Sequence, residues 1–359
     1  MKNNYNIDYI RNRIDYIDKL ILKLINERAF CAQQVAIIKL YENNNNFYRP
    51  EREIQVLRRI ININNGPLSD KNIIFIFKDI ISMCLALEQP IKVAYLGPKG
   101  TFTQEAAIKH FGKSAILKAI TYIDDIFKEV KKKTVNYGII PLENSIEGMI
   151  NHTLDSLIKS KLKICGEIVL RIHQNFLIGK HTSLNMISRI YSHRQSLEQC
   201  RQWIYKKYPL IECIAVDSNA KAAILVKNEW YSAAIAGKMT AYYYNLIIQI
   251  ENIEDNIDNF TRFIVIGNKE VLPSGNDKTS LIISLRNNII TFYTLIKSFY
   301  YCNIDILCIE PRPSYNDIWN YVFFLEFKGH LNDIKIKNFI EIINNFIIEI
   351  KILGSYPKN

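Results

Sequence analysis

A compact group of polar side chains occurs at Asn259-Phe260-Thr261-Arg262-Phe263, where an amide, a hydroxyl and a guanidinium lie within four residues. The apolar residues 264–266 follow them with the character of a buried strand. A short loop leading into such a strand can hold a hydroxyl rigidly over a small anionic ligand, because the strand fixes the backbone and the phenylalanines exclude water. By itself, the pentapeptide fits an asparagine-initiated turn before a core strand at least as well.

Further polar motifs precede the pentapeptide. The first of them, at residues 97–102, is a glycine-rich turn before a helix. Free backbone N–H groups of such a turn can bind an anion, although a plain strand-to-helix turn explains the motif equally well. The Gly-Lys-Ser/Thr ending of a nucleotide-binding loop is missing from it, and no Gly-x-Ser-x-Gly elbow accompanies Ser192 and His193. The motifs are Gly97-Pro98-Lys99-Gly100-Thr101-Phe102, Pro141-Leu142-Glu143-Asn144-Ser145, Ser192-His193-Arg194-Gln195 and Gln199-Cys200.

Strand-like and helix-like segments alternate around these motifs. Residues 91–96, 137–140, 211–216 and 233–236 are typical of short buried strands, and Ser218-Asn219 is placed to cap an alanine-rich helix. This alternation predicts parallel sheets with polar loops at the carboxyl ends of the strands. We expect those loops to form a cleft.

The first ninety residues are patterned for helices. Apolar residues recur at steps of three and four from Ile7 to Leu24, which indicates one long helix with an a/d seam. The asparagines at 43–46 are expected to break it, Pro50 begins a second helix, and a third runs from about residue 70 to 88. Three helices of such unequal length close a core poorly within one chain, so helix exchange in a homodimer is plausible.

Two cations lie on the seam side of the long helix. Arg28 occupies the next seam position after Leu24, and Lys39 lies four residues after the apolar Val35. A cation there is costly unless it reaches solvent or meets an anion, and for Arg28 by itself solvent is the simpler explanation.

The composition excludes several classes of protein. The formal charge of +11 comes from dispersed lysines and arginines, which argues against a nucleic-acid groove and is compatible with small anionic substrates. Neither a bilayer-spanning apolar run nor the apolar core of a signal peptide is present, so we expect a soluble cytoplasmic protein without a membrane partner. Seven scattered cysteines form no Cys-x-x-Cys pair, which favours reduced thiols and indicates neither a metal site nor a cofactor.

Charged residues recur on the three helices in a fixed order: Arg11, Arg28, Lys39, Arg52-Glu53 and Glu88. Their order and spacing resemble the all-helical chorismate mutase domain of bifunctional P-proteins (chorismate mutase/prephenate dehydratase). The resemblance implies that Arg11 from the partner chain, Arg28 and Arg52 hold the carboxylates of chorismate. Lys39 and Glu88 would flank the ether oxygen, Glu88 as a donor only when protonated, and Glu53 would accept from the ring hydroxyl. A Claisen rearrangement needs only a fixed conformer and stabilisation of charge on that oxygen, which these residue types can supply. Arg49 and Cys84, the remaining substrate-binding candidates, depart from one branch of the family.

The central motifs together resemble prephenate dehydratase, which implies two α/β lobes of the periplasmic-binding-protein kind with substrate between them. Prephenate loses its ring carboxylate and its 4-hydroxyl, so the enzyme must protonate a leaving hydroxide. The resemblance assigns this general-acid role to the Thr261 hydroxyl. Arg262 would orient Thr261 or bind a carboxylate, whereas His152 and His193 are interpreted as structural. The other substrate-binding candidates are Thr101, Asn144, Ser145, Ser192, Gln195 and Asn259.

The C-terminal residues follow a linker-like Pro273-Ser274-Gly275 with the order strand, helix, strand, strand, helix, strand, which predicts a ferredoxin-like α+β domain. It resembles the ACT regulatory domain, with Glu310 and Arg312 in its Glu-Ser-Arg-Pro signature. Ile290-Thr291-Phe292-Tyr293 match the positions of that family's Gly-Ala-Leu-Val motif. The loss of the small Gly-Ala pair predicts that phenylalanine binds weakly or not at all as an effector, because the Thr and Phe side chains intrude on its space. Tight binding in a calorimetric titration, with inhibition of both activities, would contradict this.

The sequence therefore predicts a multidomain protein: an all-α chorismate mutase domain (residues 1–90), a two-lobed α/β prephenate dehydratase domain (91–272) and a ferredoxin-like ACT domain (273–359). The expected function is a bifunctional enzyme of phenylalanine biosynthesis that uses chorismate and prephenate. The alternative is a non-catalytic amino-acid-sensing or small-anion-binding protein built on the same domains.

Overall fold

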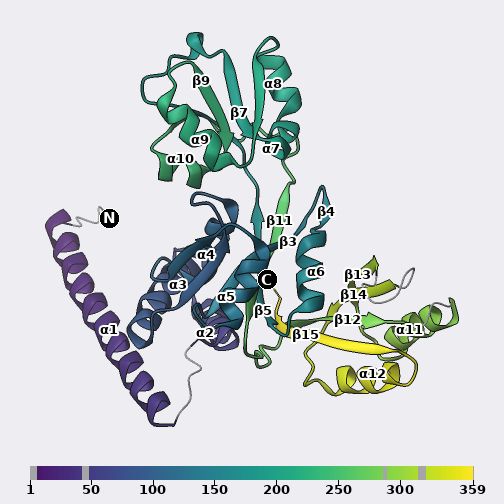
Figure 1. Cartoon of the computed structure of the whole chain (residues 1–359). Helices are drawn as coiled ribbons and strands as arrows, with labels where there is room; N and C mark the ends of the chain where they lie inside the picture. The colour runs from purple at the N-terminus through teal and green to yellow at the C-terminus, as the bar shows by residue number, and fades with distance from the viewer. Residues whose placement is uncertain (1–5, 43–47, 286–288, 314–320, 359) are drawn as a thin grey trace, which may run out of the picture. The chain divides into compact units, whose positions relative to one another are not determined.

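The computed structural model describes residues 6–42, 48–285, 289–313 and 321–358 (Figure 1). The chain forms two compact units, each treated separately below. The helical unit comprises residues up to 91 together with 111–116, and the α/β unit comprises 92–110 and 117 onward.

The helical unit contains the three predicted helices, α1 (Ile7–Tyr41), α2 (Pro50–Ile63) and α3 (Asp70–Glu88). Asn6 and Ser69 cap α1 and α3 by accepting hydrogen bonds from backbone N–H groups of their first turns, and Pro50 begins α2. The predicted helix break at 43–46 and the expectation for the first five residues lie outside the described residues.

The first lobe of the α/β unit has a central sheet in the order β2-β1-β3-β11-β5, with β4 paired to β3. β1 runs parallel to β3, whereas β11 runs antiparallel to both β3 and β5. The prediction of parallel sheets therefore holds for β1 and β3 but fails for β11, because the chain returns from the second lobe before it forms this strand. The elements are β1 (Lys92–Leu96), α4 (Phe102–Phe111), β2 (Ile116–Ile120), α5 (Ile123–Lys131), β3 (Tyr137–Asn144), β4 (Gly148–Met149), α6 (Asn151–Lys159), β5 (Lys163–Arg171) and β11 (Phe260–Gly267).

The second lobe is a five-stranded sheet, β10-β6-β9-β7-β8, with an apolar core on each face. Ala234 and Ala236 of β9 pack under α9 and α10, whereas Ala233 and Ile235 face α8, following the two-residue alternation of a strand. Ser218 caps α9 as expected. The elements are β6 (Asn175–Ile178), η1 (Leu184–Met186), β7 (Arg189–His193), α7 (Arg194–Gln199), α8 (Arg201–Lys207), β8 (Glu212–Val216), α9 (Asn219–Asn228), β9 (Ser232–Ala236), α10 (Lys238–Tyr244) and β10 (Ile247–Ile250).

The C-terminal domain, in its described residues from β12 to β15, has the predicted βαββαβ order and an antiparallel sheet β13-β14-β12-β15. This is the ferredoxin-like topology. Leu281 and Phe327 face the helices from one side of the sheet. The elements are β12 (Asp277–Ser284), α11 (Ile289–Tyr301), β13 (Ile306–Pro313), β14 (Tyr321–Lys328), α12 (Ile334–Asn344) and β15 (Glu349–Pro357).

The opposite face of the C-terminal sheet shares a core with the first lobe. Ile282 and Phe324 lie in one buried cluster with Ile264 and Ile266 of β11. At Gly354 of β15 an added Cβ would overlap the carbonyl oxygen of Ile164 in β5, so the two segments approach closely at a residue without a side chain. None of the described helices is both long and apolar enough to cross a bilayer.

Candidate active sites

A cavity of about 470 Å³ in the helical unit brings together residues from all three helices. Four cationic side chains and two carboxyl groups face it, a balance suited to a small substrate with two carboxylates. Seven of the eight predicted mutase residues line this cavity: Arg28, Lys39, Arg49, Arg52, Glu53, Cys84 and Glu88.

Two cationic side chains that line the cavity, Lys39 and Arg49, form ion pairs with carboxylates. Lys39 Nζ donates to Glu88 Oε2 at 3.0 Å, and both side chains are largely buried. Arg49 Nε donates to Glu51 Oε1 at 2.7 Å. Glu88 is an acceptor in this arrangement, so its proposed role as a donor to the ether oxygen stays a prediction.

Glu53 is the carboxyl group most strongly affected by this environment. Burial raises its pKa to about 7, and the ammonium group of Lys78 only partly opposes that rise. A partly buried carboxyl of this kind changes its charge close to neutral pH.

Arg11 is the one predicted mutase residue that does not line the cavity. Its guanidinium is exposed and lies 3.9 Å from the Asp8 carboxylate on the same helix. The seam residues around it are exposed too, with Ile14 at 51% and Ile17 at 40%. A second chain that covered this seam would complete the helical core, as the dimer prediction requires.

In the α/β unit, the pentapeptide is part of a strand rather than a loop. β11 begins at Phe260, so Thr261 and Arg262 are paired on both sides, opposite Asn144 and Glu143 of β3 and opposite Leu170 and Val169 of β5. The loop prediction is wrong because the polar residues do not end the ladder. Phe263 is buried, whereas Phe260 is 37% exposed.

Asn144 links the predicted dehydratase residues. Its Nδ2 donates to Thr261 Oγ1 at 3.0 Å and lies 2.8 Å from Asn259 Oδ1. Its Oδ1 accepts from the backbone N–H groups of Ile146 and Glu147, which fixes the side-chain amide orientation. Ser145 Oγ accepts from Phe260 N at 2.9 Å. These contacts bring together residues from two motifs more than a hundred positions apart.

The remaining candidates lie in other elements. Thr101 Oγ1 donates to Leu96 O at 3.1 Å, in the turn before α4. Ser192 is fully buried, and its hydroxyl lies 2.6 Å from Ile235 O. Gln195 Nε2, in the second lobe, donates to Glu147 Oε1 in the first.

The carboxylates that surround Arg262 were not predicted from the sequence. Glu143, Glu167 and Glu326 all lie within ion-pair distance of its guanidinium, which is 13% exposed. We call these four residues and Lys278 the Arg262 cluster. Charged side chains inside apolar strands, such as Glu326 in Phe323-Phe324-Leu325-Glu326-Phe327, were the available signal.

The predicted regulatory residues lie on β13. Arg312 donates to Asn151 Oδ1 and Asp155 Oδ1 of α6, each at 2.7 Å, so this guanidinium joins the C-terminal domain to the first lobe. Glu310 is opposite Phe324 in the ladder. Phe292 of α11 packs on Phe323, with ring centroids 5.6 Å apart.

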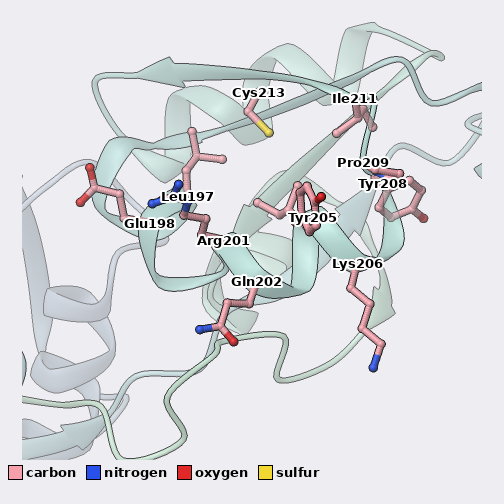
Figure 2. A pocket seen from close by; sticks show the side chains of 11 residues that line it. Leu197, Glu198, Arg201, Gln202, Tyr205, Lys206, Tyr208, Pro209, Ile211 and Cys213 are labelled. Atoms are coloured by element: carbon pink, nitrogen blue, oxygen red, sulfur yellow. The ribbon is translucent and has the colours of Figure 1, made fainter.

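Figure 2 shows a larger cavity, about 920 Å³, along α7, α8 and the start of β8. Ile204, Tyr205 and Ile211 contribute to its lining, but no predicted site residue does. Volume alone therefore does not identify the catalytic site in this unit.

Two family models match the chain. Chorismate mutase type II matches residues 10–89, and prephenate dehydratase matches residues 93–271. The bifunctional chorismate mutase/prephenate dehydratase of Pseudomonas aeruginosa is 51% identical over 353 residues, which cover 97% of each chain. That of Neisseria gonorrhoeae is 44% identical over 349 residues, covering 97% of this chain and 96% of the relative.

A solved structure resembles the α/β unit. Prephenate dehydratase from Arthrobacter aurescens, in complex with L-Phe, matches with a TM-score of 0.69 and 26% identity over 75% of this chain and 90% of that one. The two family models, the near full-length relatives and the cationic cavity agree, and the chain belongs to the bifunctional chorismate mutase/prephenate dehydratase family.

Proposed function

We propose that the two reactions of this enzyme are carried by separate residue sets, within the domain limits 1–90, 91–272 and 273–359. The mutase set is Arg28, Arg52, Lys39, Glu53 and Glu88 in the helical cavity, with Arg11 supplied by the partner in a homodimer. The dehydratase set centres on Thr261. The protein is proposed to act in the cytoplasm.

In the mutase cavity, Arg28 and Arg52 hold the two carboxylates of chorismate and so select the compact conformer. Lys39 stabilises the negative charge that grows on the ether oxygen as the C–O bond breaks and the new C–C bond forms. The carboxylate of Glu53 accepts a hydrogen bond from the ring hydroxyl. This proposal is supported by the position of these four side chains, which all line the same cavity.

In the dehydratase site, the hydrogen bond from Asn144 Nδ2 to Thr261 Oγ1 is the observation that carries the proposal. A hydrogen bond donated to Thr261 Oγ1 stabilises this oxygen while the hydroxyl releases its proton. Because Oγ1 accepts this bond, the hydroxyl hydrogen points away from Asn144. Thr261 gives that proton to the 4-hydroxyl of prephenate, which leaves as water. The ring carboxylate departs as CO₂, and its bonding electrons complete the aromatic ring of phenylpyruvate.

Replacement of the hydroxyl tests this role. Thr261→Ala should lower the dehydratase kcat by about a thousandfold, because a positioned general acid contributes on the order of 10²–10⁴-fold. Thr261→Ser keeps a hydroxyl and should retain most of the activity. Both variants should convert chorismate to prephenate at the wild-type rate, as followed by absorbance. Substantial phenylpyruvate formation by Thr261→Ala would overturn the assignment.

The C-terminal domain is proposed to be an ACT domain with weakened phenylalanine binding. The Arthrobacter relative was solved with L-Phe, and its likeness extends over most of the α/β unit. Here Thr291 is buried and the ring of Phe292 packs against Phe323, so side chains fill the positions where a ligand would need close backbone approach. Feedback by phenylalanine is therefore expected to be weak.

A further inference from the structure

Arg262 is anchored by carboxylates from both domains of the α/β unit. Its Nε and Nη2 lie 3.0 and 2.9 Å from Glu143 Oε2 of β3, and its Nη1 lies 2.6 Å from Glu326 Oε2 of β14. Glu167 of β5 is 3.5 Å from the same Nη1. Burial opposes the charge, but Glu326 and the other neighbouring acidic groups more than offset it, so the pKa of Arg262 is raised.

Glu326 is itself held firmly. Ser280 Oγ and the hydroxyl of Tyr356 donate to its Oε1 at 2.8 and 2.9 Å, and Lys278 Nζ lies 3.7 Å from its Oε2. The side chain is 2% exposed. Burial would raise the pKa of this carboxyl, but Arg262 and Lys278 hold it below its ordinary value, so Glu326 is an anion at neutral pH.

The position of Arg262 matters for chemistry because it follows Thr261 directly. Successive side chains of a strand point to opposite faces, so Arg262 reaches into the cluster while Thr261 meets Asn144. The β11–β3 pairing shifts register between Arg262 and Phe263. A bulge locally weakens the ladder, so the side-chain anchor on Arg262 supplies part of the restraint on the Thr261 backbone.

The apolar contacts continue this link. Ile264 and Ile266 share the face of Arg262 and pack in one core with Ile282 and Phe324 of the C-terminal sheet. The carboxylate of Glu326, which belongs to that sheet, is therefore held in a nearly fixed position relative to β11.

We propose that Glu326 of the C-terminal domain is a positioning residue for dehydration, which acts by holding Arg262 and thereby setting the place of Thr261. This inference rests on the proposed role of Thr261. It gives the C-terminal domain a part in dehydratase catalysis that is separate from effector binding.

Glu326→Gln keeps the shape of the side chain and removes its charge. We expect the dehydratase kcat of the full-length enzyme to fall by about 10- to 100-fold, since small displacements of a catalytic group cost this much, with KM changed less than about threefold. Glu341→Gln, at an exposed position of α12 in the same domain, is the matched control and should retain the wild-type kcat. A Glu326→Gln enzyme as active as this control would refute the proposal.

A double-mutant cycle separates positioning from general loss of structure. If Glu326 acts through Arg262, then Glu326→Gln should cause little further loss of kcat in an Arg262→Gln background. If the double variant instead loses kcat by the product of the two single losses, Glu326 does not act through Arg262. Far-ultraviolet circular dichroism and thermal melting identify any variant that does not fold.

Tyr356→Phe provides a milder variant if Glu326→Gln does not fold. It removes one hydrogen bond to Glu326 Oε1 and should lower kcat by about three- to tenfold. Wild-type kcat in Tyr356→Phe would then count against the proposal. Activity retained by Thr261→Ala would instead refute the role of Thr261, whereas an inactive Thr261→Ala beside a fully active Glu326→Gln would refute only the positioning role.

Discussion

The two proposed sites differ in where their charged side chains lie relative to the substrate. The mutase cavity presents its charges to the ligand, with Lys39 and three arginines facing the same space as Glu53 and Glu88. At the dehydratase strand the charges lie beneath, in the Arg262 cluster, and neutral Thr261 and Asn144 occupy the other face. Thr261 is proposed as a proton donor with little intrinsic acidity, and such a donor would benefit from the rigid placement that a buried ionic anchor supplies.

Glu53 gives the helical unit a pH-dependent stability. Its folded pKa is raised from 4.5 to about 7, so the unit binds the proton more tightly when folded, and stability is lost as pH rises through about 7. Glu53→Gln is neutral throughout. Between pH 5 and pH 8 the stability of this variant relative to the wild type should improve by up to about 2.5 kcal/mol, and by less where solvent screens the partly exposed side chain.

Urea denaturation followed at both pH values measures this difference, and the exposed Glu27→Gln is the matched control. An equal effect of Glu53→Gln at pH 5 and pH 8 would show that burial does not raise the pKa of this carboxyl.

The sequence predicted seven of the residues that line the mutase cavity, and it predicted Asn144 and Thr261 as separate members of the dehydratase site. The hydrogen bond between these two side chains was not predicted. The sequence could not predict the Arg262 cluster. Glu143, Glu167, Lys278 and Glu326 are spread over more than 180 positions, and only the alignment of β3, β5, β12 and β14 around β11 brings them together.

Among the elements, α1 has the least support from its own chain. Of its residues only Ala36 is buried, and its apolar seam is exposed from Ile7 to Leu24. A 35-residue helix of this kind is stabilised mainly by tertiary packing. This is the structural basis for proposing that a second chain packs along α1 and delivers Arg11.

Ile17→Glu should disrupt that packing, because an unpaired carboxylate in an apolar interface costs several kcal/mol. We expect the mutase kcat/KM to fall by about 100-fold or more. A loss of several kcal/mol in the association free energy would separate the two chains and remove the partner's Arg11 from the cavity. Dehydratase activity should persist. Lys19→Glu, on the opposite side of the helix, is the control, and sedimentation velocity reports the assembly. Unchanged mutase activity in Ile17→Glu would contradict the shared site.

Helix periods predicted the elements of the helical unit well, and strand and helix order predicted the C-terminal topology. The direction of β11 could not be predicted, since alternation along the sequence favours parallel strands and does not reveal a chain that crosses to a second lobe and returns. For the same reason the motif around Thr261 was interpreted as a loop, although it lies within a central strand.

The whole molecule is proposed to carry two independent sites, linked by prephenate that one site releases and the other takes up. The helical unit and the α/β unit are compact separately, and no proposed catalytic residue of one belongs to the other. The C-terminal domain is coupled to the dehydratase lobe by a shared core and by Arg262.

Complementation between two inactive variants tests whether the two sites are independent. Arg28→Ala should lose the mutase reaction and Thr261→Ala the dehydratase reaction, so neither purified variant alone should convert chorismate to phenylpyruvate. An equal mixture should do so, because prephenate made by Thr261→Ala is dehydrated by Arg28→Ala. Phenylpyruvate from either variant alone, or none from the mixture, would show that the two reactions do not use two independent sites with these residues.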